Sequence, residues 1–141
     1  MPFVKVMIHA VWGTKNREPF LTSEIRALVI KHIKENAKVK GIHIDSINGY
    51  TEHLHCLFGL NADMSLSKAM QLIKGESAYW INKNNLIKNK FEWADEYYAA
   101  SVSESVLEKV RAYIDNQEQH HKKVTFSKEY QDFIDKYKFD G

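Results

Sequence analysis

A short segment near the middle of the chain alternates imidazole and apolar side chains, and this limits the structures that the chain can adopt. Residues 53–58 read His-Leu-His-Cys-Leu-Phe, so a single residue separates His53 from His55. On an extended strand, residues two apart point to the same face of the sheet, so both imidazoles emerge together. Leu54 and Cys56 then point to the opposite face. The segment therefore predicts a strand with two chemically different faces.

The composition of the chain is that of an ordinary globular domain. The 141 residues include 44% hydrophobic and 27% charged side chains, and the net charge of +2 permits nucleic-acid binding without indicating it strongly. No run of about eighteen apolar residues is present, so no transmembrane helix is expected. The single cysteine, Cys56, excludes an intrachain disulfide and suits a reducing cytoplasm. We therefore expect one cytoplasmic domain over residues 1–141.

Hydrophobic spacing and turn signals predict an order of strands and helices. We expect strands over residues 3–13, 42–50, 53–60 and 97–102, and helices over residues 21–40, 65–83, 103–121 and 127–137. Gly41 is expected to end the first helix, and Ser105 and Glu108 have the spacing of a capping box. The order β-α-β-β-α-β followed by helix is the split βαβ pattern of ferredoxin-like folds. The prediction is an α+β fold with an antiparallel sheet, helices on one face and an additional C-terminal helix.

The alternation along the first and third strands assigns their side chains to the two faces of this sheet. We expect Val4, Val6, Ile8, Ala10 and Trp12 to face the first two helices, and Phe3, Met7, His9 and Val11 to share the other face with His53, His55 and Leu57. The second face is half apolar and half imidazole. Because such a surface is seldom left exposed, we expect the late helix or a partner chain to cover it.

Two polar residues of the predicted late helix could complete a reactive site with the histidines. Tyr113 and Gln117 are four residues apart, so they share one helical face. If this helix covers the imidazole face, the Gln117 amide oxygen can join His53 and His55 as a third metal ligand. The Tyr113 hydroxyl would then lie nearby as a nucleophile for phosphodiester transesterification. The additional helix is thus the expected catalytic helix.

Each of these residues also has a plain structural interpretation. A tyrosine such as Tyr113 on an apolar helix face is typical of a protein core, and a histidine pair can be structural. His120 and His121 follow Gln117 closely and are alternative ligands. A structural zinc domain is a competing interpretation, although the chain lacks thiolate ligands and a closed four-ligand spacing. Only the conjunction of these residues favours a reactive site.

Four segments, in chain order, resemble the small single-tyrosine HUH transposases of insertion sequences, the superfamily of the IS200-like and REP-associated tyrosine transposases. Residues 49–55 resemble the His-hydrophobic-His motif, and residues 113–117 resemble the Tyr-x-x-x-Gln helix. Residues 9–17 are similar to the first strand and following turn of that family, and residues 72–75 to its second helix. The resemblance covers nearly the whole chain.

The resemblance implies an enzyme that cuts and rejoins single-stranded DNA at the ends of an insertion sequence. It implies Mg²⁺ or Mn²⁺ at His53, His55 and Gln117, a 5′-phosphotyrosine intermediate on Tyr113, and a free 3′-hydroxyl. It also implies recognition of DNA hairpins near the element ends, and a homodimer whose active sites are completed across chains.

The resemblance also indicates DNA contacts and leaves other functions open. Lys15, Arg17 and Lys74 lie in the segments that resemble the family and are the expected DNA-binding residues. A domesticated hairpin-binding nuclease, or a nucleic-acid-binding protein that no longer transposes, would keep the same fold. A replication initiator or relaxase shares the chemistry, but such proteins are usually larger.

Overall fold

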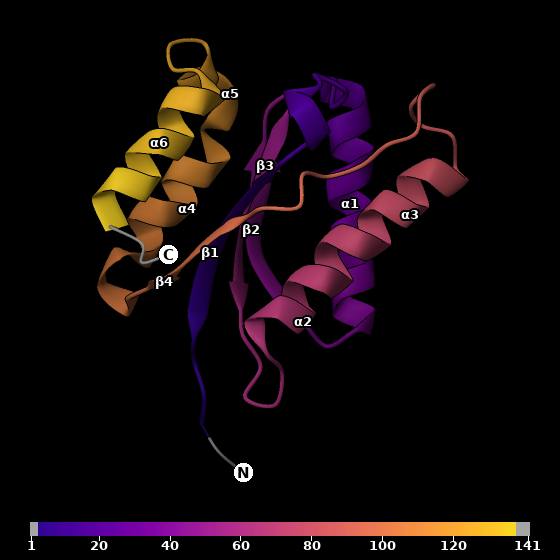
Figure 1. Ribbon diagram of the computed structural model, residues 1–141. Helices are drawn as coiled ribbons and strands as arrows, with labels where there is room; N and C mark the ends of the chain where they lie inside the picture. The colour runs from indigo at the N-terminus through magenta and orange to yellow at the C-terminus, as the bar shows by residue number, and fades with distance from the viewer. Residues whose placement is uncertain (1–2, 138–141) are drawn as a thin grey trace.

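In the computed structural model, which describes residues 3–137, four antiparallel strands form one sheet with helices on both faces (Figure 1). The strands are β1 (Met7–Gly13), β2 (His43–Gly49), β3 (His53–Gly59) and β4 (Tyr98–Val102). Their order across the sheet is β2-β3-β1-β4, and each neighbouring pair is antiparallel. This is the ferredoxin-like arrangement, so the predicted α+β fold class is confirmed.

One face of the sheet is covered by two long helical segments. The first is α1 (Ser23–Val39), and the second runs through α2 (Leu66–Met70), the π-helical turn η2 (Gln71–Gly75) and α3 (Glu76–Lys83). The Ser65 side chain accepts a hydrogen bond from the Lys68 backbone amide and so caps the second segment, as a helix starting near residue 65 requires. His32 joins the two segments, because its Nε2 lies 2.7 Å from a carboxylate oxygen of Glu76.

The apolar core lies between this face and these helices. Its members from β1 and β3 are Ile8, Ala10, Trp12, Leu54, Cys56 and Phe58. Trp12 and Phe58 are fully buried, and burial of one such large side chain stabilises the fold by about 1.5–3 kcal/mol. The alternation predicted for both strands is confirmed along these residues.

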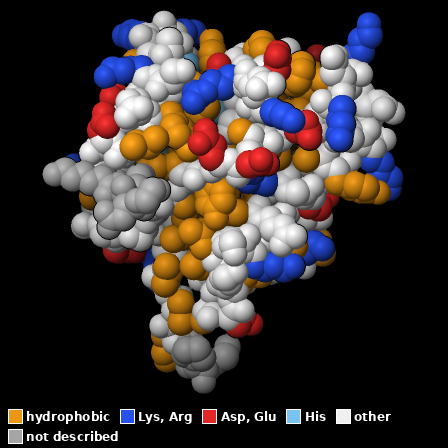
Figure 2. All heavy atoms as spheres, viewed as in Figure 1, with side chains coloured by type: hydrophobic (Ala, Val, Ile, Leu, Met, Phe, Trp, Pro, Cys, Tyr) orange, Lys and Arg blue, Asp and Glu red, His pale blue; other side chains and the backbone are white. Residues whose placement is uncertain are grey.

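The first strand is shorter than the sequence predicts. Phe3, Val4 and Val6 precede it and are exposed, and Figure 2 shows apolar side chains along this N-terminal segment at the bottom of the view. The expectations that Val4 and Val6 face the helices and that Phe3 lies on the other face of the sheet are therefore wrong. β1 begins to pair at Met7, which lies opposite Gly59 and Val102, the last residues of β3 and β4. Composition alone does not indicate where a neighbouring strand ends.

The second face is covered by the C-terminal part of the chain. The helices there are η3 (Glu104–Val106), α4 (Leu107–Asp115), α5 (Gln117–His121) and α6 (Phe126–Tyr137). Figure 1 shows them on the opposite side of the sheet from α1 and α3. Met7 and Leu57 of the sheet pack with Leu107 and Ile114 of α4. Of the two covers that the sequence left open, the late helix or a partner chain, the described residues show the late helix.

Two details of the late helix differ from the prediction. The helix expected over residues 103–121 is interrupted at Asn116, where α4 ends and α5 begins. The predicted capping box is absent, because the Ser105 hydroxyl lies 3.1 Å from the Ser103 hydroxyl and caps no helical amide. The break gives α4 and α5 separate positions on the sheet.

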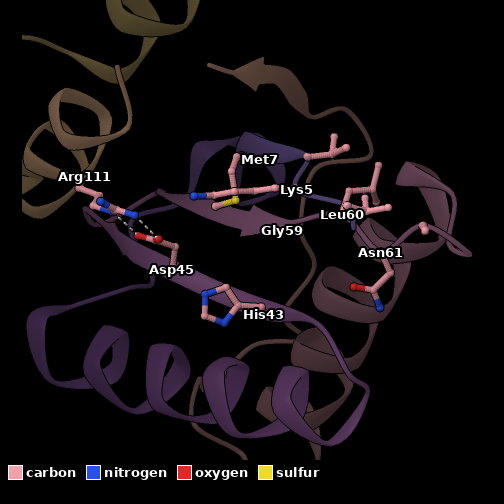
Figure 3. Close-up of a pocket in the computed structure, with 11 residues that line it drawn as sticks. Lys5, Met7, His43, Asp45, Gly59, Leu60, Asn61 and Arg111 are labelled. Carbon is pink, nitrogen blue, oxygen red and sulfur yellow. Dashed lines mark hydrogen bonds and ion pairs between the residues drawn. The ribbon is translucent and has the colours of Figure 1, made fainter. Parts of the chain in front are cut away.

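Side chains of β2 fix the position of α4. The Nε and Nη2 atoms of Arg111 each donate a hydrogen bond of 2.8 Å to the carboxylate of Asp45, a bidentate geometry visible in Figure 3. The Asn48 amide donates to the backbone carbonyls of Ile114 and Asp115, at 3.1 and 3.2 Å. These contacts attach α4 to β2 at Arg111 and again at its C-terminal end. Because Tyr113 lies between the two attachments, they also orient its side chain.

The Arg111–Asp45 pair lies beside a surface hollow of about 570 Å³. Its lining includes Lys5, Met7 and His43 (Figure 3). This hollow adjoins the end of the sheet where Met7 pairs with Gly59, whereas the histidine motif begins at the other end.

Within residues 3–137, no helix combines the length and apolar character that a membrane span needs.

Candidate metal and nucleophile site

Three histidines of the sheet lie together on the face covered by α4, α5 and α6. His53 and His55 are fully buried, and their ring centroids are 5.1 Å apart. His9 of β1 is also buried, and its Nε2 lies 2.9 Å from Nδ1 of His55. Strand alternation predicted this grouping, because all three residues point to the same face.

Gln117 and Tyr113 reach the same histidines from the helical layer. Oε1 of the buried Gln117 lies 3.2 Å from Nε2 of His53. The Gln117 amide donates a 3.2 Å hydrogen bond to the backbone carbonyl of Tyr113, which keeps the oxygen turned toward His53. The Tyr113 ring is half-buried, with its centroid 5.6 Å from that of His55. The four residues predicted to form a site therefore gather in one place, while their roles remain predictions.

A carboxylate that the sequence did not single out lies at the centre of this group. Glu129 of α6 is only 3% exposed. Its Oε1 lies 3.0 Å from Nε2 of His55, 3.2 Å from Nε2 of His121 and 3.4 Å from Nε2 of His53. Three imidazoles thus converge on one carboxylate oxygen.

The second oxygen of Glu129 faces the tyrosine. The Tyr113 hydroxyl donates a hydrogen bond to Oε2, and Nε2 of His120 lies 3.0 Å from the same oxygen. His120 is also 3.4 Å from the Tyr113 hydroxyl. Glu129 therefore connects the histidines of the sheet to the candidate nucleophile.

A helical-wheel argument could have found Glu129. Phe126, Tyr130 and Phe133 follow the i, i+4, i+7 spacing of an apolar stripe, and the structure packs them beside Val11 and Tyr98. Glu129 is three residues after Phe126 and four before Phe133, so it lies inside that stripe. A charged residue within an apolar stripe indicates a buried polar partner, whereas its acidic neighbours on this helix are exposed.

Burial keeps two of the histidines neutral. It lowers the pKa of His9 to about 3, with a smaller contribution from repulsion by His55. It lowers the pKa of His55 to about 4, against the opposing effect of the hydrogen bond to Glu129. Burial also works to lower the pKa of His53, but the contacts with Glu129 and Glu52 outweigh it and raise that pKa.

The carboxylate and the phenol influence each other. Burial would raise the pKa of Glu129, but hydrogen bonds from His121, His53 and His55 outweigh it and hold the pKa well below its usual range. Burial, and then the adjacent Glu129 carboxylate, raise the pKa of Tyr113 well above its ordinary value. Tyr113 is therefore protonated in this arrangement, and a positive charge nearby would make its ionisation easier.

The donor atoms of the site have the chemistry of a cation site. The ligand atoms of His53, His55, His121 and Glu129 all lie within 4.8 Å of one another. Nδ1 of His53 lies 2.7 Å from the Glu52 carboxylate, which can only accept, so the neutral ring presents a lone pair at Nε2. That lone pair faces the oxygens of Gln117 and Glu129. Such acceptors repel one another unless a proton or a metal ion lies between them, so the residues fit a divalent metal.

Two of the predicted DNA-binding residues lie in the turn η1 (Lys15–Arg17) after β1. Lys15 is exposed and forms an ion pair of 3.1 Å with Glu92. The Arg17 guanidinium lies over the rings of Phe126 and Tyr130, 4.6 and 5.7 Å from their centroids. Arg17 thus borders the helix that carries Glu129.

The third predicted contact, Lys74, lies on the other side of the sheet. Its ammonium group donates to the backbone carbonyls of Ala94 and Asp95, at 2.8 and 3.3 Å. These bonds hold the segment that precedes β4.

On the face seen in Figure 2, Lys and Arg side chains are interspersed with acidic ones and form no single basic patch.

The structure is similar to two solved transposase structures. One is a protein from Deinococcus radiodurans R1 assigned as a transposase, with a TM-score of 0.67, 22% identity, and coverage of 82% of this chain and 93% of that chain. The other is a REP-associated tyrosine transposase bound to a REP hairpin, with a TM-score of 0.59, 17% identity, and coverage of 87% and 71%. At these identities the similarity concerns the fold.

Sequence comparison gives the family directly. No curated protein matches the chain. The family described as "Transposase IS200 like" matches residues 3–117, which include His53, His55, Tyr113 and Gln117. The match ends before α6, so His121 and Glu129 lie outside it. Because it nevertheless spans most of the sequence, the chain belongs to the IS200-like transposase family.

Proposed function

We propose that this protein is a transposase that cleaves and rejoins single-stranded DNA at insertion-sequence ends, with Tyr113 as the nucleophile. His53, His55 and Gln117 would hold Mg²⁺ or Mn²⁺, and the protein would act in the cytoplasm. The observation that carries the proposal is the gathering of these four side chains in one place. Oε1 of Gln117 lies 3.2 Å from Nε2 of His53, and the ring centroids of Tyr113 and His55 are 5.6 Å apart. Membership of the IS200-like transposase family supports it.

In the proposed reaction, the Tyr113 oxygen bonds to the scissile phosphorus while the bond from phosphorus to the 3′ oxygen breaks. The phenol proton passes to Oε2 of Glu129, which already accepts the hydrogen bond of that hydroxyl. The departing 3′ oxygen takes a proton from water and becomes a free 3′-hydroxyl. The product is a 5′-phosphotyrosine, and because phenolate is a good leaving group, the bond is kept for rejoining.

The remaining side chains position these groups. Glu52 orients the His53 ring through Nδ1, and His9 contacts Nδ1 of His55, as outer partners of metal-binding histidines commonly do. Gln117 is oriented by its bond to the Tyr113 carbonyl. A bound divalent metal would polarise the phosphate and offset the charge that develops in the transition state.

Recognition of DNA hairpins is part of the proposal. One of the similar structures is a REP-associated tyrosine transposase bound to a REP hairpin, which supports the same class of DNA for this chain. The position of Arg17 beside α6 would place a cation next to DNA that enters the site. A domesticated hairpin-binding protein that no longer transposes is the alternative.

The expected homodimer, with sites completed across chains, remains a prediction. In this chain α4 packs on its own sheet, so the residues of one chain are sufficient to form the group. Mixing the Tyr113→Phe and His55→Ala variants decides between the two assemblies. Exchange of α4 between copies would restore cleavage in the mixture, whereas assembly within one chain would leave it inactive.

The test of the proposed function is a covalent adduct. The protein is incubated with Mn²⁺ and labelled single-stranded hairpins, including the sequences that flank its own gene. We expect an SDS-resistant adduct that maps to Tyr113 by mass spectrometry and disappears with chelator or in Tyr113→Phe. Tyr130→Phe, which alters a tyrosine of α6, is the matched control and should form the adduct. Hairpin binding without an adduct would favour the domesticated protein, and loss of both would favour a structural metal domain.

A further inference from the structure

The central position of Glu129 has a consequence beyond proton transfer. We propose that Glu129 and His121 are ligands of the same metal ion as His53 and His55, so that α6 forms part of the metal site. This inference rests on the proposed function for the presence of a divalent metal. Both residues lie outside the part of the chain that matches the transposase family.

The first support is the convergence of donor atoms. Nε2 atoms of His53, His55 and His121 lie 3.4, 3.0 and 3.2 Å from a single oxygen of Glu129. All four groups are almost completely shielded, since the side chains of His121 and Glu129 are each 2% exposed. Donor atoms around one ion with bonds of about 2.1 Å lie about 3–4 Å apart. The distances from Glu129 fall in this range, and all four donor atoms lie within 4.8 Å of one another, so the group would contract slightly around a metal.

The second support is the arrangement of protons on the rings. Nδ1 of His121 lies 2.6 Å from the Val124 carbonyl, and Nδ1 of His53 lies 2.7 Å from the Glu52 carboxylate. Both partners can only accept, so each Nδ1 carries a proton and Nε2 is the ring atom turned toward Glu129. Each Nε2 therefore meets the carboxylate oxygen through either a proton or a metal ion. The outer hydrogen bonds at Nδ1 are those typical of metal-binding histidines, which leave Nε2 free to bind the ion.

The third support is the way in which α6 is attached. Phe126 stacks on the His53 ring, with centroids 4.0 Å apart and planes 4° apart. Phe133 packs edge-on against His9 and His55, at 5.8 and 6.0 Å. Contacts at both sides of Glu129 thus hold the helix so that its carboxylate enters the group. A carboxylate is rarely buried unless it is paired with a cation or binds a metal.

The donor set also leaves space for a substrate. Mg²⁺ and Mn²⁺ prefer about six ligands, so three imidazoles and one carboxylate oxygen leave positions for Gln117 or a phosphate oxygen. Oε1 of Glu129 faces the histidines, and Oε2 accepts the Tyr113 hydrogen bond. One oxygen of the Glu129 carboxylate would therefore bind the metal, while the other accepts the hydrogen bond of the nucleophile Tyr113.

The first experiment measures metal binding without DNA. Mn²⁺ is titrated into the full chain, and free Mn²⁺ is followed by its electron paramagnetic resonance signal. We expect Glu129→Gln and His121→Ala each to weaken binding at least tenfold, and His55→Ala to abolish it. Asp132→Asn is the matched control, because Asp132 is an exposed carboxylate of the same helix, and it should change the affinity less than twofold. Unchanged affinity in Glu129→Gln and His121→Ala would overturn the inference.

A second measurement on the unaltered chain avoids any variant that fails to fold. Hydrogen exchange of the α6 amides is followed by mass spectrometry with and without Mn²⁺. A metal that binds Glu129 should slow exchange over residues 126–137 by at least severalfold. Unchanged or faster exchange would show that α6 is not tied to the metal, and would overturn the inference whatever the variants do.

Failure of this inference is distinguishable from failure of the proposed reaction. A Tyr113 adduct together with Mn²⁺ affinity independent of Glu129 and His121 would remove these two ligands and leave the transposase chemistry standing. Mn²⁺ binding that requires Glu129, with no adduct on any hairpin, would remove the reaction and leave the metal site standing.

Discussion

The two faces of the sheet use the same strands for different purposes. Toward α1 and α3, β3 presents Leu54, Cys56 and Phe58, all fully buried among apolar side chains. Toward α4, α5 and α6, the same strand presents His53 and His55, which are equally buried but have polar partners at their ring nitrogens. Burial alone therefore does not distinguish a core from a site, and the nature of the neighbours does.

The difference indicates how stability and chemistry are divided. Each large apolar side chain on the first face adds to the free energy of unfolding. The buried polar groups of the second face are stabilising only while all are paired, and one unpaired partner costs about 1–3 kcal/mol. The first face therefore contributes mainly to the free energy of unfolding. The second face contributes to it only while every polar group of the network keeps its partner.

The largest expected effect separates the faces completely. Tyr113→Phe should reduce adduct formation by at least about 10³-fold, because the attacking oxygen is gone, while the free energy of unfolding changes by less than about 1.5 kcal/mol. Phe58→Ala should instead lower the free energy of unfolding by about 3–5 kcal/mol, because it leaves a cavity in the apolar core. Urea denaturation and the adduct assay measure both quantities.

Either of two results would break this division. A Tyr113→Phe protein as unstable as Phe58→Ala would show that the tyrosine is mainly a core residue. Normal adduct formation by Tyr113→Phe would show that another residue is the nucleophile. Hairpin binding, measured on the same samples, should be close to normal in Tyr113→Phe.

The next effect is a pH dependence confined to the histidine face. Folded His9 and His55 have pKa values of about 3 and 4, whereas an unfolded histidine has a pKa of about 6.5. Between these values the unfolded chain binds more protons, so the free energy of unfolding should fall as the pH drops from 6.5 to 4, by about 1.4 kcal/mol per unit for each histidine. The raised pKa of His53 affects a different pH range, since its contribution to the free energy of unfolding is lost only as the pH rises above 6.5.

Denaturation with chelator present, between pH 7 and pH 4.5, measures this slope. His9→Gln removes one of the two titrating groups and keeps an amide that can contact His55, so its slope should be about half as steep. A slope unchanged by His9→Gln would show that His9 is not held neutral by the fold.

Much of this comparison was available from the sequence. The alternation through residues 53–58 predicted both faces of β3, because side-chain direction along a strand is a local property. The i, i+4 spacing of Tyr113 and Gln117 predicted that they lie together. The mixed apolar and imidazole character of the second face predicted that the late helix or a partner chain covers the histidines. These inferences need only the geometry of single elements.

The remaining features depend on packing between elements. β1 starts at Met7, opposite the last residues of its two neighbours, and the break at Asn116 lies between two helices that both contact β2. Glu129 enters the group only because α6 folds back over it, and no local pattern states that Glu129 and His55 meet across 74 residues. Its place inside an apolar stripe was the available signal.

A smaller effect concerns the alignment of the second face. Arg111→Ala should slow adduct formation about tenfold, since α4 would lose its bidentate contact with Asp45 and Tyr113 would be less well aimed. Asp45→Asn should have a similar effect, and the double variant should add little, because both remove one interaction. Lys109→Ala, on the exposed side of the same helix, should form the adduct at the normal rate. Additive effects would show that Arg111 acts independently of Asp45.

The smallest effect tests whether DNA meets only the histidine face. Arg17 packs against α6 on that face, whereas Lys74 is bonded to carbonyls before β4 on the side of α3. Arg17→Ala should weaken hairpin binding severalfold and reduce the slope of log affinity against log salt by about one, the effect of one lost phosphate contact. Lys74→Ala should leave that slope unchanged, because its ammonium group is already used by the protein. Equal slope changes in both variants would mean that DNA contacts both sides of the sheet.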